Sequence, residues 1–178
     1  DETRMFDLVE EMRLDGHAVT GQVWDVRNPY IFGMDQVFPK IIFHCAARKH
    51  VTPMEDTPME AVEVNIVGTY NMLQLADKNH CFFVNISTDK VVNAECVMGA
   101  TKKVAELMVK NARHTSVRFG NVLGSRGSVI PIWQKQMDQG KPLTVTDEKM
   151  ERYMMTIEEA CSLVIDVMSM DDVAGKIV

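Results

Sequence analysis

Several features that would announce a function are scarce or absent in this sequence. Its 178 residues include no apolar run that approaches the roughly 20 residues of a membrane-spanning helix, and no signal peptide is visible. The 19 lysines and arginines are outnumbered by 25 aspartates and glutamates, and the net charge of −6 argues against a nucleic-acid-binding protein, which usually carries a basic face. The five histidines show no metal-ligand spacing such as HExxH, so we expect no metal site.

Cysteine is also scarce. The chain has four, Cys45, Cys81, Cys96 and Cys161, and no two of them stand in CxxC spacing. Cys45 and Cys81 lie in apolar runs that are typical of buried strands. Reduced, buried thiols are typical of cytoplasmic proteins, and we predict that location.

The length and composition predict one globular domain that covers residues 1–178. A domain of this size buries roughly 70% of the surface of its unfolded chain. Apolar residues make up 46% of the sequence and charged residues 25%, as in ordinary globular proteins. The chain has no initiator methionine and opens within a helical pattern, which indicates a fragment.

Strand-like and helix-like segments alternate along the chain. Short apolar runs predict strands at residues 18–24, 40–47, 81–87 and 115–122, and a further strand from residue 175. Helical spacing of apolar residues predicts helices at residues 3–13, 58–79, 97–112, 128–140 and 156–170, the last with a capping box formed by Thr156 and Glu159. This alternation predicts an α/β fold, a Rossmann-like, doubly wound parallel sheet with helices on both faces.

Three polar clusters follow predicted strands. They are HCAARKH at residues 44–50, STDK at 87–90 and GNVLGSRGS at 120–128. Ligands of such sheets bind at the carboxyl ends of the strands, so we expect the clusters to converge on one rim. The glycine-containing turn around Arg126 could form an anion nest or be a plain flexible turn. Arg152 could hold a diphosphate or form a surface ion pair.

Four segments together resemble one known family. They are FHCAARKHVTPMEDTPMEAVEVNIVGT, ISTDKVVNAECVMGATKKVAE, VRFGNVLGSRGSVIP and ERYMMTIEEA, and they resemble the nucleotide-sugar 4,6-dehydratases of the polysaccharide-biosynthesis (CapD-like) family, which are extended short-chain dehydrogenases. The family's glycine-rich phosphate loop would precede residue 1, and its final substrate segment would follow Val178. The resemblance therefore implies a Rossmann-like domain truncated at its N-terminus, in which residues 121–178 contribute to the nucleotide-sugar-binding side.

The resemblance also implies an activity and its partners. The activity is the NAD(P)-dependent 4,6-dehydration of a UDP-N-acetylhexosamine, UDP-N-acetylglucosamine, to a 4-keto-6-deoxy sugar for surface polysaccharide or glycan biosynthesis. The cofactor is NAD or NADP, with NAD favoured. The family further implies a homo-oligomer and, through segments outside this chain, association with the inner face of the membrane.

The residues that match the family's motifs inherit roles by the same resemblance. The implied catalytic residues are Thr88, Asp89, Lys90, Lys102 and Met98, which stands where short-chain dehydrogenases have a tyrosine. The implied cofactor-binding residues are Asp25, Val26, Ala46, Ala47, Lys49, Asn65, Ser87 and Lys102. The implied substrate-binding residues are Asn121, Val122, Arg126, Ser128 and Arg152.

Met98 raises the question of which group takes the proton of the sugar's C4 hydroxyl, because methionine has no titratable proton. Thr88 could hydrogen-bond this hydroxyl and relay its proton, while Asp89 and Lys90 supply the acid and the base for elimination. An Asp–Lys pair at a strand end can equally be a surface ion pair.

Two other functions stay open. A non-catalytic remnant that serves as a scaffold or interface is consistent with the absent glycine-rich loop. A nucleotide-sugar 4-epimerase would share the fold, although epimerases on this scaffold usually rely on the tyrosine that is missing here and need no Asp–Lys pair at this strand end.

Overall fold

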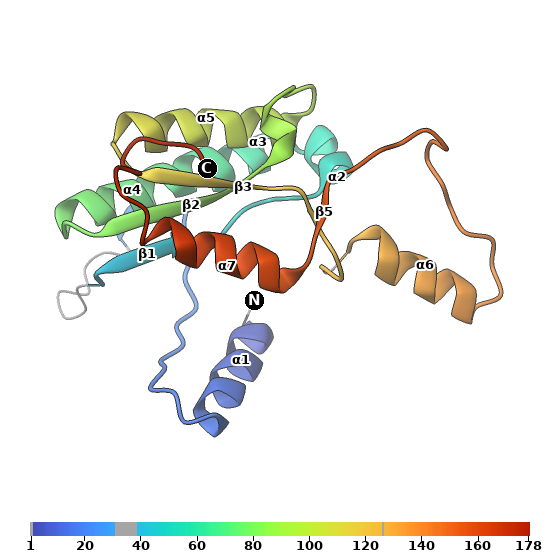
Figure 1. Ribbon diagram of the computed structural model, residues 1–178, viewed down its shortest axis with the longest axis horizontal. Helices are drawn as coiled ribbons and strands as arrows, with labels where there is room; N and C mark the ends of the chain where they lie inside the picture. Colours follow the sequence, from blue (N-terminus) through green and yellow to red (C-terminus); the bar gives the residue numbers. More distant parts are fainter. Residues whose placement is uncertain (1, 31–38, 126) are drawn as a thin grey trace.

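The protein forms a parallel sheet with helices on both faces (Figure 1). The computed structural model describes residues 2–30, 39–125 and 127–178. The central sheet has the strand order β1-β2-β3 and consists of β1 (Ile41–His44), β2 (Phe82–Thr88) and β3 (Thr115–Phe119). The predicted Rossmann-like α/β class is confirmed.

The helices are distributed along the whole chain. They are α1 (Glu2–Leu14), α2 (Val51–Asp56), α3 (Pro58–Ala61), α4 (Gly68–Lys78), α5 (Val97–Asn111), α6 (Val129–Asp138) and α7 (Ile157–Val167). Shorter elements are the π-helical turn η2 (Val62–Val67), the 3-10 turn η3 (Asp89–Val91) and the strands β4 (Asn121–Val122) and β5 (Met154–Met155), which pair with each other. Within the described residues, no helix combines the length and the apolar character needed to cross a membrane.

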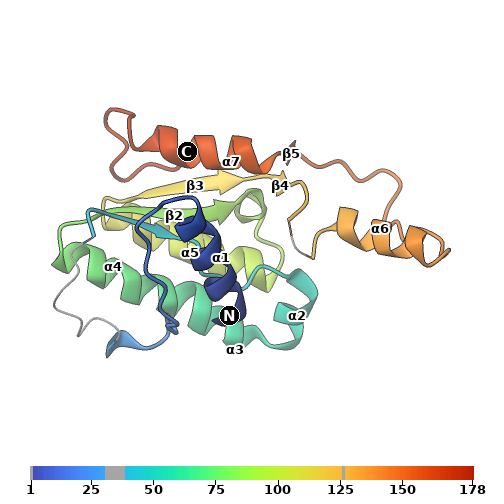
Figure 2. The ribbon, with the colours of Figure 1, turned by 90° about the horizontal axis from the view of Figure 1, so that it is seen from below.

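Alternate residues of the strands point to opposite faces of the sheet and build two cores. On one face Phe83 packs with Leu73 of α4 and Val109 of α5. On the other face Val84 packs with Val167 of α7. Figure 2 shows α4 and α5 on one side of the sheet and α7 on the other. Because helices cover both faces, the strands are short apolar runs rather than alternating patterns.

The helix predicted at residues 58–79 is continuous but contains a π-helical turn. Segments α3, η2 and α4 follow one another directly, and Pro58 occupies the first helical turn, where its missing N–H leaves no bond unmade. Such turns are frequent at functional sites. Here η2 carries the buried side chain of Asn65, which contacts the loop that follows β1.

The strand predicted at residues 18–24 is wrong, because this segment is irregular in the structure. A strand needs a hydrogen-bonded neighbour, and no described residue forms a ladder with this segment. Val23 and Trp24 are about half exposed, at 57% and 51%, which means that the apolar alternation does not mark a buried face here.

The strand predicted at residues 115–122 is divided at Gly120 into β3 and β4. A Cβ at Gly120 would lie 2.6 Å from the carbonyl oxygen of Tyr153, so only glycine allows this close approach. After Gly120 the chain leaves the central sheet and pairs with β5, where the N–H of Asn121 donates to the Tyr153 carbonyl at 2.8 Å.

The strand predicted from residue 175 is present only in part. Ser116 and Ile177 form a parallel bridge, and the N–H of Val178 donates to the carbonyl of Ser116 at 2.9 Å. The final residues therefore extend the sheet beyond β3.

Candidate active site

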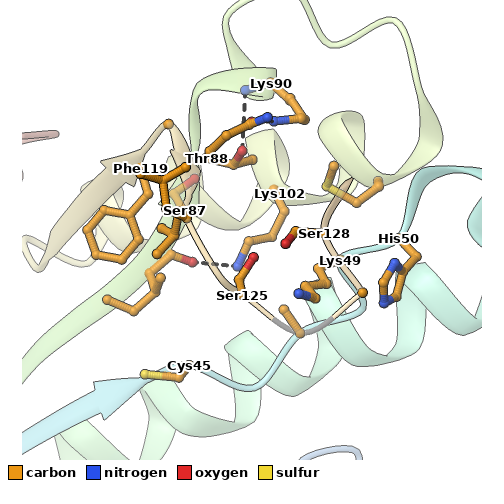
Figure 3. A pocket seen from close by; sticks show the side chains of 18 of the residues that line it. Cys45, Lys49, His50, Ser87, Thr88, Lys90, Lys102, Phe119, Ser125 and Ser128 are labelled. Carbon is orange, nitrogen blue, oxygen red and sulfur yellow. Dashed lines mark hydrogen bonds between the residues drawn. The ribbon is translucent and has the colours of Figure 1, made fainter. Parts of the chain in front are cut away.

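A pocket of about 410 Å³ lies at the carboxyl ends of β2 and β3, beside the loop that follows β1 (Figure 3). The predicted site residues that line it are Ala47, Lys49, Ser87, Thr88, Lys90, Met98, Lys102, Asn121, Val122 and Ser128. Asp25, Val26, Ala46, Asn65, Asp89 and Arg152 are not among its lining residues, and Arg126 lies outside the described residues. All three polar clusters of the sequence contribute residues to the pocket, as expected because ligands of parallel sheets bind at the carboxyl ends of the strands.

The tripeptide that ends β2 forms a hydrogen-bonded cluster. Thr88 is the N-cap of η3, and its hydroxyl donates to Oδ1 of Asp89 at 3.1 Å. The Lys90 ammonium donates to the same oxygen at 2.9 Å and to Oδ1 of Asn121 at 3.1 Å. The Lys90 and Asp89 side chains are 36% and 30% exposed, so the ion pair alone stabilises the fold by at most about 1 kcal/mol.

Asn121 thus does more than face the pocket, since it orients Lys90. Its backbone N–H is tied to Tyr153 in the β4–β5 pair. The position of the segment around residues 153–155 therefore determines where the Asn121 amide lies, and through it where the Lys90 ammonium lies.

Lys102 lies on α5, and its side chain extends past β2 into the pocket. Its side chain is buried, and its ammonium donates to the Ile86 carbonyl at 2.6 Å. Burial lowers the pKa of this amine to about 8, while its Coulombic interactions with Cys45 and Glu106 act in the opposite direction. An amine with this pKa exchanges protons near neutral pH.

Met98 lies one helical turn before Lys102 and faces the same pocket. It is buried against Met54 and Ala61. Packing explains its presence, and its thioether offers no proton to exchange.

Two of the predicted cofactor-binding residues, Asp25 and Val26, are not among the residues that line the pocket. Asp25 pairs with Arg27 at 2.6 Å, and this hydrogen bond lowers the pKa of the Asp25 carboxyl to about 2. Arg27 also reaches Glu60, which in turn pairs with Arg48 of the loop after β1. The carbonyl of Val26 accepts a hydrogen bond from the Asn71 side chain at 2.9 Å.

Asn65 holds the loop after β1 in place. Its Oδ1 accepts the Arg48 N–H at 2.7 Å, and its Nδ2 donates to the Arg48 carbonyl at 3.1 Å and to the Thr101 hydroxyl at 3.0 Å. The side-chain amide is therefore used within the chain, and Asn65 acts on the site by positioning the backbone of residues 46–49. Ala46 is exposed in this loop, and Ala47 is partly buried.

The far wall of the pocket contains an orphaned polar atom. The hydroxyl of Ser128, the N-cap residue of α6, is buried and has no hydrogen-bond partner among the described residues. Beside it, a Cβ at Gly127 would lie 2.7 Å from the His50 ring. Lys49 and His50 face this wall in Figure 3. A buried hydroxyl without a partner, near a lysine and a helix N-terminus, suits an anionic ligand. Arg152 is exposed and does not line the pocket; among the described residues, its guanidinium donates to the Glu151 carbonyl at 2.7 Å.

Sequence reasoning missed three groups at or under this site. His50 and Cys45 line the pocket, and Glu106 lies buried beneath it. The four-residue spacing from Lys102 to Glu106 places both on one face of a helix, and this signal could have identified Glu106. His50 and Cys45 belong to the predicted polar cluster at residues 44–50, but no motif assigned either of them a role.

Comparison with known proteins identifies the family. The model of a family described as "Polysaccharide biosynthesis protein" matches residues 2–178. The chain belongs to this family. The resemblance seen in its motifs is thereby confirmed.

Relatives of known description support this assignment. The chain is 52% identical over 156 residues to "Probable polysaccharide biosynthesis protein EpsC" of Bacillus subtilis (strain 168), a match that covers 84% of this chain and 26% of the relative. It is 48% identical over 140 residues to "Capsular polysaccharide biosynthesis protein CapD" of Staphylococcus aureus, covering 74% of this chain and 23% of CapD. A third relative, "UDP-glucose 4-epimerase" of Rickettsia canadensis, is 39% identical over 173 residues, covering 88% of this chain and 49% of the relative. The chain thus spans a quarter to a half of these proteins.

Solved structures agree on the fold. Pen from Bacillus thuringiensis superposes with a TM-score of 0.88 at 37% identity, covering 96% of this chain and 57% of Pen. DesIV, a dTDP-glucose 4,6-dehydratase from Streptomyces venezuelae, superposes with a TM-score of 0.78 at 20% identity, covering 86% of this chain and 55% of DesIV, and shows a common fold.

Proposed function

We propose that the protein containing this chain is an NAD(P)-dependent 4,6-dehydratase of a UDP-N-acetylhexosamine, acting in surface polysaccharide biosynthesis. The observation that carries the proposal is the cluster of Thr88, Asp89, Lys90 and Asn121 beside one pocket, with Met98 at the tyrosine position. Membership of the polysaccharide biosynthesis family supports the biological role.

The described residues fit the nicotinamide end of the cofactor, which we propose is NAD or NADP, with NAD favoured. The Lys102 amine is held at the pocket by the Ile86 carbonyl, ready to donate to a ribose hydroxyl. When bound, the nicotinamide would accept a hydride from C4 of the sugar and return it to C6. The chain has no glycine-rich phosphate loop, so we expect the 178 residues alone to carry little dinucleotide and the full-length protein to co-purify with it. Stoichiometric NAD(P) in acid extracts of the chain alone would contradict this.

Thr88 and Asp89 would take the C4 proton. The Thr88 hydroxyl accepts the proton of the C4 hydroxyl while it passes its own proton to Asp89, to which it already donates at 3.1 Å. Asp89 thereby becomes a carboxylic acid. Its neutralisation removes the counter-charge of the Lys90 ammonium, which favours release of a proton from Lys90 to solvent.

Elimination would then follow on the same two side chains. The neutral Lys90 amine removes the C5 proton, which the new C4 ketone has made acidic, and the C5–H electron pair becomes a C5–C6 double bond. Asp89 gives its proton to the C6 hydroxyl, which leaves as water. Lys90 later returns a proton to C5 and takes back from solvent the proton that it first released, which restores the Lys90–Asp89 ion pair.

The test is made in the full-length protein with UDP-N-acetylglucosamine in heavy water. Lys90→Ala should abolish deuterium incorporation at C5, whereas Asp89→Asn should slow loss of the C6 hydroxyl by roughly 10²–10⁴-fold, as expected for a general acid. Lys110→Ala, at an exposed position on α5, serves as the control. Wild-type turnover by Lys90→Ala would refute the assigned role.

A 4-epimerase is the second candidate, because a relative of that description is 39% identical to this chain. The product distinguishes the two, since an epimerase returns a C4 epimer that keeps its C6 hydroxyl. A non-catalytic remnant would yield neither product from the full-length protein.

The remaining assignments concern partners and organisation. We propose that residues 121–178 contribute to the UDP-sugar side, because Asn121, Val122 and Ser128 line the pocket. A homo-oligomer is supported by Val104 and Leu107, apolar side chains that are exposed on α5 at 41% and 53%. Sedimentation of the full-length protein tests this. We also propose a cytoplasmic enzyme, held at the inner membrane face by segments outside this chain.

A further inference from the structure

A carboxylate that no step of the proposed reaction uses lies buried beneath the pocket. Glu106 of α5 is fully buried, at 0% exposure. Its Oε1 accepts hydrogen bonds from the Ser87 hydroxyl at 2.6 Å and from Nε of Arg118 at 2.9 Å, and its Oε2 accepts one from Nη2 of Arg118 at 2.7 Å. Three donors therefore satisfy this carboxylate, as a buried charge requires.

The arrangement joins three elements of the site. Ser87 and Arg118 are direct neighbours across the β2–β3 ladder, so their side chains leave the same face of the sheet toward α5. The Glu106 carboxylate accepts hydrogen bonds from both side chains. One turn earlier on α5, Lys102 donates to the carbonyl of Ile86, the residue before Ser87. Two side chains of α5 thus hold two consecutive residues of β2, directly before Thr88.

The charges around Lys102 indicate that Glu106 has an electrostatic role in addition to holding β2 against α5. The titratable groups around its amine are Glu106 on α5, His44 and Cys45 at the end of β1, and Lys49 and Lys90, which line the same pocket. Arg118 on β3 binds Glu106. Burial lowers the pKa of His44 to about 4, so this ring is neutral near pH 7. Glu106 is therefore the buried negative charge on the helix of Lys102, and Arg118 is the positive charge that it binds.

We propose that Glu106 is a positioning residue that holds the end of β2 against α5, and that Arg118 balances its charge so that the carboxylate does not bind the proton of the neighbouring Lys102 amine more tightly. The use of this amine in catalysis rests on the proposed function, whereas the charge balance is a property of the chain itself.

The charge balance predicts that removing the charge of Glu106 and removing the charge of Arg118 shift the pKa of Lys102 in opposite directions. Glu106→Gln keeps the shape and an acceptor for Ser87 but leaves the Arg118 charge unopposed, so the pKa of Lys102 should fall by about 0.5–1 unit. Arg118→Met leaves the negative charge of Glu106 unbalanced, so the pKa of Lys102 should rise by about the same amount. The double variant has no charge at either position, and its Lys102 should titrate within about 0.3 unit of wild type.

The experiment follows the Lys102 amine by NMR. The 178-residue chain is labelled with ¹³C at the ε-carbons of lysine, the Lys102 signal is assigned by its loss in Lys102→Arg, and each variant is titrated from about pH 6 to pH 11. The exposed Lys110 on the same helix is the internal control. Asp172→Asn, which removes one charge from the distant Lys176 pair, is the matched control and should leave Lys102 unchanged.

A purely structural role would lower the free energy of unfolding in both single variants without moving Lys102 in opposite directions. If the pKa of Lys102 shifts in the same direction in Glu106→Gln and in Arg118→Met, the proposal is overturned. If Arg118→Met does not fold, Glu106→Gln and the double variant decide, because replacing both members of a buried pair is often tolerated. The proposal then fails if Glu106→Gln does not lower the pKa or if the double variant does not restore it. Since neither cofactor nor sugar is present, absence of dehydratase activity would leave this result intact.

Discussion

Replacing Lys102 by methionine should change the pH dependence of stability in a direction that the structure dictates. Burial lowers the pKa of Lys102 from 10.5 to about 8 in the folded chain. Below pH 8 the amine is charged in both the folded and the unfolded chain, and the folded chain carries the full penalty of burying the charge. Between pH 8 and 10.5 only the unfolded chain keeps the proton, so the free energy of unfolding of the wild type rises with pH. Lys102→Met has no such titration.

The size of the effect follows from the shift. One pKa unit corresponds to roughly 1.4 kcal/mol, so Lys102 should contribute about 3 kcal/mol of stability at pH 10.5 that is absent at pH 7. The variant also leaves the Ile86 carbonyl without its donor, which costs about 1–3 kcal/mol at every pH. The stability of the variant relative to wild type should therefore decrease by about 3 kcal/mol from pH 7 to pH 10.5, whatever the constant offset.

Urea unfolding of both proteins at half-unit pH steps measures this difference, and titrations common to both chains cancel. Lys110→Met, an exposed change on the same helix, should show no trend with pH. If the difference in free energy of unfolding between Lys102→Met and the wild type stays constant within about 1 kcal/mol from pH 7 to pH 10.5, the reasoning that burial lowers the pKa of Lys102 is refuted.

Three further predictions test local parts of the site and the fold. In the full-length protein, Met98→Leu should leave the rate within a few fold and cost under about 1.5 kcal/mol, whereas Thr88→Val should slow reduction of bound NAD(P)⁺ in single turnover by roughly 10²-fold; the reverse pattern would place the C4 base elsewhere. Gly120→Ala should destabilise the β4–β5 pair by about 2 kcal/mol, seen as faster amide hydrogen exchange of Asn121, because its Cβ would lie 2.6 Å from the Tyr153 carbonyl; unchanged exchange would contradict this. Thr156→Ala should lower the free energy of unfolding by about 1 kcal/mol through loss of the observed capping box, and Thr156→Ser should retain most of it.

The local pattern of the sequence was sufficient to predict the fold class and most of the pocket. Apolar periodicity identified the elements at β1, β2, α4, α5 and α7, because each of these buries a face whose spacing is set within a few residues. The three polar clusters met at one rim because parallel strands align their carboxyl ends. The capping box of α7 was also visible, since its partners are three residues apart.

Tertiary structure decided what local spacing cannot report. The segment at residues 18–24 has a strand-like pattern but no partner strand among the described residues, and a strand exists only through its neighbour. Gly120 ends β3 because Tyr153, 33 positions later in the numbering, occupies the space of a side chain.

The same holds for the chemistry of the site. The sequence placed Asp89 and Lys90 side by side, but only the folded chain brings Asn121 to the Lys90 ammonium. It also brings Arg118 and Ser87 to Glu106, and surrounds Lys102 with enough protein to lower its pKa. Desolvation and charge balance depend on every group packed around an atom, and residues distant in the sequence supply most of those groups.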